Sequence, residues 1–264
     1  MIISHKHKFI FIHTERTGGT SIAKSLIPHL GPKDEIYGYT HEGELLSDKN
    51  RSINLRGGSG KRHEQGLSPW KHSTAHWVKK HVGNRKWKAY FKFAFIRNPW
   101  DIYLSLFHHW KKGKGKWDPV PKGFPEKYNK IKKMSFDEYL CSNLKWEYTL
   151  LDYLLVEKKE PSRVDPFASG TSAQDIGIDL DFVGRYEKLR LDFSYLCGRL
   201  DLPNLFLWRN NESRSLEDRR HFSSYIKNEK SRSEIRKKHS VDTNYFKYSY
   251  EYNEYEDSWN YYMM

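Results

Sequence analysis

A run of glycine and hydroxyl residues follows the first strongly apolar stretch of the chain. Lys8 to His13 has the composition of a short buried strand, and Ile22, Leu26 and Leu30 then recur at helical spacing. The sequence RTGGTS, residues 16–21, lies between these two segments. A turn from a strand into a helix aims backbone N–H groups and the positive end of the helix at one place, so this turn could hold an oxyanion.

The composition of the turn suits phosphate or sulfate. Its glycines allow the backbone to approach a ligand closely, and its hydroxyl groups can donate hydrogen bonds. These residues are Thr17, Gly18, Gly19, Thr20 and Ser21. The turn is not a Walker A loop, because that loop needs a lysine directly before its Ser or Thr, whereas here the nearby cation, Arg16, precedes the glycines. An ordinary tight turn is the alternative interpretation.

A second strand end carries a similar combination 81 residues after Arg16. Residues 90–96 alternate as a buried strand would, and the helix expected over Asp101 to Trp110 carries Ser105. Arg97 would stand at the carboxyl edge of its strand, where ligands of open α/β sheets bind. Two strand ends that each bring an arginine and a hydroxyl to one rim fit a ligand with two anionic groups. An isolated Arg97 could instead pair with a surface acid.

Strands and helices continue to alternate along the chain. We expect a helix from His72 to His81 that ends at Gly83, a helix from Ser135 to about Leu144, a strand near Leu180 to Val183 and a helix from Leu189 to Leu200. This order predicts an α/β fold with a central parallel β-sheet flanked by helices.

The length of 264 residues suits a single domain over residues 1–264. The polar, glycine-punctuated stretch 38–68 and the basic stretch 111–130 are expected to be loop insertions. Residues 245–264 form a tyrosine-rich C-terminal tail, which could be a packed edge of the domain, a sugar-stacking platform or a partner surface.

The net charge favours an anionic partner. Lys and Arg number 46 against 33 Asp and Glu, which leaves +13. This charge fits a phosphate, sulfate, nucleic-acid or acidic substrate, as well as a basic solvated surface, and it says nothing about the fold. A hydrophobic content of 37% excludes a disordered chain.

The cysteine content and the N-terminus bear on the cellular compartment. With Cys141 and Cys197 alone, the chain has no disulfide framework and no clustered thiols for a metal, and we expect no metal. The apolar run near the N-terminus is too short for a signal sequence or a membrane span, so the expected location is the cytoplasm.

Several stretches resemble one known family. FIHTERTGGTSI, residues 11–22, resembles the 5′-phosphosulfate-binding loop of sulfotransferases that use 3′-phosphoadenylyl sulfate (PAPS), and FAFIRNPWDIYLSLF, residues 93–107, resembles their 3′-phosphate-binding segment. The resemblance is strongest to carbohydrate O-sulfotransferases of the heparan sulfate 2-O type and their bacterial relatives. Arg16 departs from the pattern, since most relatives carry lysine there, but arginine keeps the charge and adds a planar fork for oxyanions.

The resemblance implies a P-loop-like sulfotransferase fold and transfer of a sulfuryl group from PAPS to an acceptor hydroxyl of a carbohydrate. The product would be 3′-phosphoadenosine 5′-phosphate (PAP). Arg16 would stabilise the leaving group, while Thr17, Gly18, Gly19, Thr20 and Ser21 would hold the 5′ phosphate and sulfate. Arg97 and Ser105 would hold the 3′ phosphate, with Arg185, Arg219 and Arg220 as further cofactor contacts.

The acceptor hydroxyl must lose a proton to a base that titrates near neutral pH. His72 is the candidate, because its KHSTA context matches the segment that supplies the base in the related glycan enzymes. His13 beside the loop is the competitor, although a histidine at a strand end is more often structural. Glu15 and His76 are weaker candidates, and Lys71 could contact the sulfate or be solvated.

Other functions remain open from the sequence. Interleaved basic and aromatic residues in VKKHVGNRKWKAYFK, residues 78–92, fit a nucleic-acid-binding surface. A nucleotide kinase is disfavoured by the missing loop lysine. A glycan, a lipid, a small alcohol or a peptide tyrosine would each offer a suitable hydroxyl, and the basic loops favour an acidic saccharide. The sequence leaves the oligomeric state open.

Overall fold

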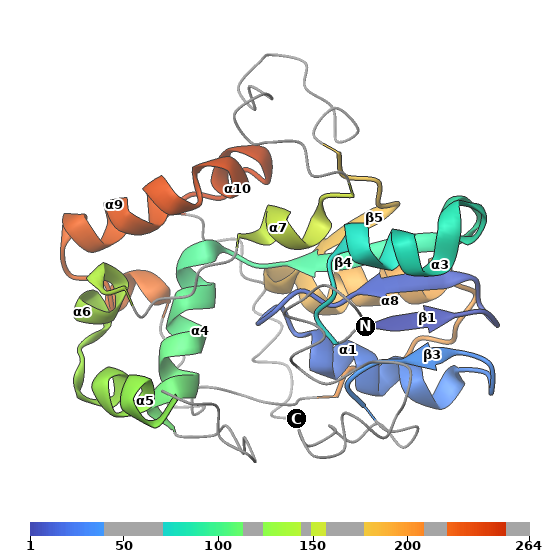
Figure 1. Ribbon diagram of the computed structural model, residues 1–264, viewed down its shortest axis with the longest axis horizontal. Helices are drawn as coiled ribbons and strands as arrows, with labels where there is room; N and C mark the ends of the chain where they lie inside the picture. Colours follow the sequence, from blue (N-terminus) through green and yellow to red (C-terminus); the bar gives the residue numbers. More distant parts are fainter. Residues whose placement is uncertain (40–70, 113–123, 144–148, 157–176, 209–220, 252–264) are drawn as a thin grey trace. The chain divides into compact units, whose positions relative to one another are not determined.

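The computed structural model describes residues 1–39, 71–112, 124–143, 149–156, 177–208 and 221–251 (Figure 1). The chain divides into two compact units. The first contains residues 1–96, 150–210 and 254–264, and the second contains residues 97–149 and 211–253. Most of the predicted loop 38–68, the segment 113–123 and most of the predicted tail lie outside the described residues.

The first unit is built on a five-stranded sheet with the strand order β3-β1-β2-β4-β5. Its strands are β1 (Ile2–Ser4), β2 (Phe9–Ile12), β3 (Glu35–Ile36), β4 (Phe91–Ile96) and β5 (Phe182–Arg185). The strands β2, β4 and β5 run parallel, as predicted. The predicted α/β fold with a central parallel sheet is confirmed, and β1, which was not predicted, pairs antiparallel with β2 and β3. Only residues 5–8 join β1 to β2, and so short a connection permits a hairpin but no crossover.

One face of the sheet is covered by α1 (Gly19–Leu26) and α8 (Leu189–Arg199). The phenylalanines of β2 and β4 point to this face, and the rings of Phe11 and Phe93 stack with 5.1 Å between their centroids. Ile22 of α1 and Phe193 of α8 are buried against them. The alternation of side chains along each strand therefore places an aromatic layer under the two helices.

The opposite face of the sheet carries the other set of alternating residues. Lys92 of β4 lies on this face with its Nζ 5.8 Å from the centre of the Trp87 ring, which belongs to α3 (Ala75–Ala89). The helix predicted from His72 to His81 is thus confirmed in part, since Thr74 caps its start and Gly83 interrupts it with φ of 77°. A short helix in this unit, α7 (Leu150–Leu154), was not predicted.

The described part of the second unit is helical. It contains α4 (Pro99–Lys111), α5 (Phe124–Lys133), α6 (Phe136–Cys141), α9 (Glu229–Lys238) and α10 (Ser240–Tyr245). Asn98 caps α4, and a Ser135–Glu138 capping box opens α6 where the sequence predicts a helix to begin. The helix α5 corrects the prediction of a loop over 111–130, and its basic residues Lys130, Lys132 and Lys133 gather in the last turn, where they complement the helix dipole.

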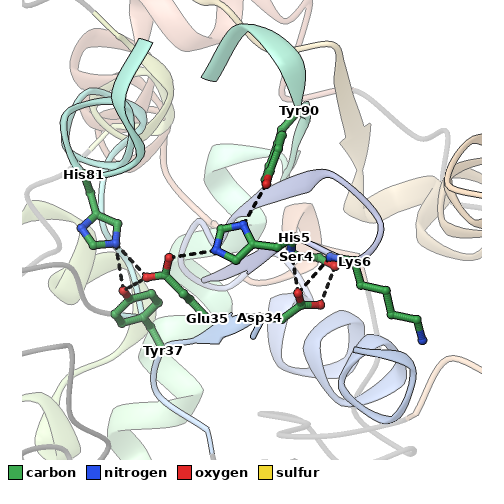
Figure 2. A network of polar contacts seen from close by, with 8 residues as sticks. All are labelled: Ser4, His5, Lys6, Asp34, Glu35, Tyr37, His81 and Tyr90. Atoms are coloured by element: carbon green, nitrogen blue, oxygen red, sulfur yellow. Dashed lines mark hydrogen bonds and ion pairs between the residues drawn. The ribbon is translucent and has the colours of Figure 1, made fainter. Parts of the chain in front are cut away.

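A buried carboxylate organises the antiparallel edge of the sheet (Figure 2). Asp34 accepts hydrogen bonds from the Ser4 hydroxyl at 2.6 Å and from the backbone N–H groups of His5 at 2.7 Å, Lys6 at 3.0 Å and Gly31 at 2.9 Å. Burial opposes ionisation of Asp34, but these hydrogen bonds outweigh it and lower the pKa of the carboxyl group. The hairpin after β1 is therefore tied to the turn before β3.

The neighbouring Glu35 lies between two histidines (Figure 2). Its Oε2 accepts from the Tyr37 hydroxyl at 2.6 Å and lies 2.8 Å from Nε2 of His81, while its Oε1 lies 3.3 Å from Nε2 of His5. Burial raises the pKa of Glu35, but the contacts with His81 and Tyr37 outweigh that effect and lower it to about 2.

We expect Glu35 to make folding sensitive to acid. Its pKa of about 2 in the folded state lies below the ordinary 4.5, so the unfolded chain takes up the proton first as the pH falls. The stability that Glu35 contributes is present above pH 4.5 and is lost as the pH falls toward 2. Urea unfolding across this pH range should show a smaller decrease in the free energy of unfolding for Glu35→Gln than for the wild type.

Glu229→Gln is the matched control, because Glu229 is exposed and makes only long ion pairs with Arg232 and Arg236. It should follow the wild-type pH dependence. Identical curves for Glu35→Gln and the wild type would contradict the role given to Glu35.

Candidate functional site

The predicted anion loop connects β2 to α1 in the first unit. The buried Thr14 hydroxyl donates to the carbonyl of Phe95 in β4 and lies 2.8 Å from the Thr17 hydroxyl oxygen. Thr17 is itself 1% exposed, and its hydroxyl donates to the Thr14 carbonyl at 3.1 Å. These side chains anchor the loop to the sheet, so a contribution of Thr17 to ligand binding would come from its backbone.

The two loop glycines are required by close packing. Gly18 has φ of +80°, and a Cβ there would lie 2.7 Å from Cδ2 of Leu189. A Cβ on Gly19 would lie 2.1 Å from Cδ2 and 2.2 Å from Nε2 of His13. Since atoms cannot approach so closely, a side chain at either position would displace the loop. The N–H groups of Gly19 and Thr20 belong to the first turn of α1, where no intrahelical acceptor is available.

Arg16 has a left-handed backbone conformation with φ of 61°. This conformation costs a residue other than glycine on the order of 1–3 kcal/mol, and such strain gathers at functional sites. The Arg16 side chain is partly exposed. The loop thus holds a cation in a strained conformation directly before its glycines.

A second layer of side chains surrounds the start of α1. The buried Tyr39 hydroxyl lies 3.2 Å from Nδ1 of His13 and 3.3 Å from the hydroxyl oxygen of Thr20. Lys71 donates to the same Thr20 oxygen at 3.4 Å, and its Nζ lies 4.9 Å from the centre of the Tyr39 ring. The structure therefore brings Tyr39 and Lys71 to the loop, although they are 32 residues apart in the sequence.

His72 lies in the turn before α3, and its ring meets that of His13 edge to face with 4.6 Å between the centroids. Its Nδ1 is 2.9 Å from the backbone carbonyl oxygen of His13. A carbonyl oxygen only accepts hydrogen bonds, so Nδ1 of His72 carries the proton. In the neutral ring, Nε2 of His72 is consequently the basic nitrogen.

His13 differs from His72 in its electrostatics. Only 2% of its surface is exposed, and burial lowers its pKa well below the ordinary value, with further lowering by the positive charges of His72 and Lys71. Burial also raises the pKa of the neighbouring Tyr39, far above the physiological range. Both side chains are therefore neutral at physiological pH.

Arg97 and Ser105 lie in the second unit, Arg97 two residues before α4 and Ser105 in the middle of that helix. Arg97 is 4% exposed, and its Nε and Nη2 contact Oδ2 of Asp101 at 2.8 Å and 2.7 Å. Arg97 therefore pairs with an acid, as the alternative interpretation expected. This acid is buried and lies four residues further along the chain, rather than on the surface. Ser105 follows Asp101 by four residues, so these two polar residues lie on one face of α4.

Arg185 is the last residue of β5 and lies in the first unit. Its backbone N–H donates to Asp192 at 2.6 Å, and the next residue, Tyr186, packs beside Gly18 of the loop. Arg219 and Arg220 lie outside the described residues. Glu15 is partly exposed in the loop, and His76 has its Nδ1 2.6 Å from the carbonyl oxygen of Val156, which is a structural contact.

Sequence reasoning missed Tyr39, because it assigned residue 39 to a polar loop. The structure instead buries Tyr39, which is 1% exposed. The signal that could have found it is the alternation of aromatic residues in YGY, residues 37–39, directly after Ile36. The same sequence explains why Gly38 is required, since a Cβ there would lie 2.6 Å from Cβ of Lys71.

The described part of the chain has no group of three or more His, Cys, Asp or Glu side chains placed to hold a metal ion. Among the described helices, none combines the length and the apolar composition needed to cross a bilayer.

Comparisons with known proteins give the family. Residues 1–255 match the family model described as "Sulfotransferase family". An uncharacterized protein of Archaeoglobus fulgidus is 26% identical over 126 residues, which are 48% of this chain and 80% of that protein. No solved structure matches the chain significantly.

The packing of His13 on Gly19 predicts a large effect of one methyl group. We expect Gly19→Ala to lower the free energy of unfolding by about 1–3 kcal/mol, the usual cost of overpacking, because the Cβ would overlap the imidazole. Denaturant unfolding measures this change. The further substitution His13→Ala should restore part of the lost stability by removing the ring.

Gly198→Ala is the control, because nothing lies within 4 Å of a Cβ at this exposed position of α8. It should raise stability by about 0.5–1 kcal/mol, the usual advantage of alanine over glycine in a helix. Equal effects of the two alanines would mean that the His13 contact does not constrain Gly19.

Proposed function

Because the chain belongs to the sulfotransferase family, it is a transferase of sulfuryl groups to hydroxyl-bearing acceptors, and we propose that its donor is PAPS and its acceptor a saccharide. When bound, PAPS would supply an activated sulfuryl group that leaves PAP behind. The observation that carries the proposal is the clustering of an oxyanion loop and a histidine base in one unit, joined through His13.

The loop fits the 5′ end of such a donor. The first-turn N–H groups of Gly19 and Thr20, which have no intrahelical acceptor, and the positive end of α1 favour a group with negative charge. The glycines leave a cradle that a Cβ would fill. These features supply donors of hydrogen bonds without a metal ligand set, which suits a sulfate or phosphate group.

Arg16 would neutralise the charge that develops on the leaving phosphate. Sulfuryl transfer resembles phosphoryl transfer in spreading charge over oxygens, so fixed positive groups contribute most when they are already in place. The left-handed backbone of Arg16 supports this role, because such strain persists only where the surrounding structure holds it, and it gathers at functional sites. Its guanidinium can contact two oxygens at once.

His72 would accept the proton of the acceptor hydroxyl at its Nε2. The hydrogen bond from Nδ1 to the carbonyl of His13 holds the ring in the tautomer that leaves Nε2 basic. A buried His13 with a lowered pKa is a poorer base at neutral pH, which favours His72 over its competitor.

The 3′ phosphate would be held by Arg97 and Ser105, with Arg185, Arg219 and Arg220 as further contacts. Asp101 orients the guanidinium of Arg97 through two of its nitrogens. The choice of a saccharide acceptor rests on the resemblance of the chain to carbohydrate O-sulfotransferases.

Nucleotide selectivity tests the donor. At equal concentrations, PAP should raise the melting temperature more than AMP or ATP, because ligand binding to the folded state adds about 2.7 kcal/mol at a hundredfold excess over the dissociation constant. The double variant Arg97→Gln/Asp101→Asn should lose the preference for PAP over AMP while avoiding a buried carboxylate without its guanidinium. Transfer of labelled sulfate from PAPS to a panel of saccharides completes the test.

Equal shifts with PAP, AMP and ATP would overturn the choice of PAPS as donor. Label on a lipid or a tyrosine peptide, with none on any saccharide, would overturn the choice of acceptor.

The role of His72 predicts a pH profile. His72→Gln should lower turnover by about 10²–10⁴, the usual range for removal of a general base, and should abolish the fall in turnover at acidic pH that protonation of the imidazole causes. Binding of PAP should be retained. His76→Gln is the matched control, since Nδ1 of the His76 ring lies 2.6 Å from the carbonyl oxygen of Val156, a structural contact. If the turnover of His72→Gln still falls at acidic pH, another group accepts the proton of the acceptor.

A further inference from the structure

The hydroxyl group of Thr20 receives hydrogen bonds from two side chains to which the proposed reaction gives no role. The Tyr39 hydroxyl donates to the Thr20 oxygen at 3.3 Å, and Nζ of Lys71 donates to the same oxygen at 3.4 Å. Thr20 is the second residue of α1 and is partly exposed, whereas Tyr39 is 1% exposed. A buried phenol and an amine thus converge on one hydroxyl oxygen at the start of the helix that follows the loop.

The proton of Tyr39 has a defined direction. Burial raises the pKa of Tyr39 far above the physiological range, so the phenol keeps its proton. That single proton is donated to Thr20. The contact of 3.2 Å with Nδ1 of His13 is consequently one in which the Tyr39 oxygen accepts, and Nδ1 carries the proton of the neutral His13 ring.

These contacts also decide the direction of the Thr20 proton. A hydroxyl group has one proton and two lone pairs, and the two donors occupy both lone pairs, so the proton points away from Tyr39 and Lys71. Within the described residues, the Thr20 hydroxyl donates to no side chain or carbonyl. Ser25 of the same helix shows the usual alternative, because its hydroxyl donates to the carbonyl oxygen of Ser21 at 3.0 Å. Thr20 lies in the first turn, where no helical carbonyl precedes it.

We infer that Tyr39 is a positioning residue, which holds the Thr20 hydroxyl with its proton directed toward the oxyanion at the start of α1. This inference rests on the proposed function, because it takes the 5′ phosphate and sulfate as that anion. Tyr39 acts through Thr20 and not by contact with the ligand. The hydroxyl is thereby set as a donor before the ligand arrives, which lowers the cost of ordering it on binding.

The second donor, Lys71, is held in place by the same tyrosine. The stem of Lys71 packs over Gly38, where a Cβ would lie 2.6 Å from Cβ of the lysine. Its Nζ lies 4.9 Å from the centre of the Tyr39 ring. Tyr39 therefore supports both donors to the Thr20 oxygen, one through its hydroxyl and the other through the face of its ring.

A double-mutant cycle read by ligand binding tests the inference. Tyr39→Phe removes the phenol hydroxyl and keeps the ring beneath Lys71, while Thr20→Val removes the hydroxyl of Thr20 and keeps its branched shape. Calorimetry measures the affinity of the wild type, the two single variants and the double variant for PAP. The same proteins are measured with adenosine 3′-phosphate, which lacks the 5′ phosphate.

We expect Thr20→Val to bind PAP about tenfold to a hundredfold more weakly than the wild type, the loss that corresponds to one hydrogen bond to a charged group. Tyr39→Phe should weaken PAP binding by about twofold to tenfold, which corresponds to one hydrogen bond between neutral groups. In the Thr20→Val background, Tyr39→Phe should cause no further loss, because the hydroxyl that it orients is gone. Adenosine 3′-phosphate should bind equally to all four proteins.

Two further variants separate orientation from structure. Tyr37→Phe is the matched control, because Tyr37 is also buried and its hydroxyl donates to a side chain, that of Glu35, at 2.6 Å. It should bind PAP as the wild type does. Thr20→Ser keeps a hydroxyl group, so it should retain most of the PAP affinity and remain sensitive to Tyr39→Phe.

Three results would overturn the inference. An equal effect of Tyr39→Phe with and without the Thr20 hydroxyl would make its action independent of Thr20. Equal losses for PAP and adenosine 3′-phosphate would make Tyr39 merely structural, and unchanged PAP binding in Thr20→Val would remove the hydroxyl contact. A wild type that does not prefer PAP to AMP would instead overturn the proposed donor, and the same cycle repeated with AMP, which keeps the 5′ phosphate, would still test Tyr39.

Discussion

The packing of the His13 ring on the bare α-carbon of Gly19 is the contact on which the rest of the site depends. It needs a residue without a side chain at the start of α1, since a Cβ would lie 2.1 Å from the ring. With the ring seated there, the backbone carbonyl of His13 meets Nδ1 of His72, and its Nδ1 meets Tyr39. One residue at the end of β2 thereby fixes the loop, the candidate base and the aromatic layer beneath them.

Burial divides the charges of the site into fixed and neutral groups. Tyr39 and His13 lie in an environment that disfavours their charged forms, whereas the basic residues Arg16 and Lys71 are partly exposed. In the second unit, Arg97 shares its charge with Asp101 in a buried pair. Such a pair adds little to stability by itself, but it fixes the direction of the guanidinium, which is what recognition of an anion requires.

Local patterns were enough to predict most of the elements that carry the site. The strand before the loop, the cap at Asn98, the capping box at Ser135 and the interruption at Gly83 depend on neighbouring residues, and the structure confirms them. The antiparallel strands β1 and β3 have three and two residues. Strands so short have too few alternating positions to be recognised, and they form because the Asp34 carboxylate closes the edge around them.

The sequence by itself determined that a glycine- and hydroxyl-rich turn joins a strand to a helix, with a cation before it, because these are properties of adjacent residues. Tertiary structure alone decided how the histidines are used. His13 and His72 are 59 residues apart, and both are histidines at the edge of regular elements. A folded neighbour faces one nitrogen of each ring, a carbonyl for His72 and a phenol for His13. Burial, which sets the protonation of His13, likewise exists only once α1, β2 and Tyr39 have packed together.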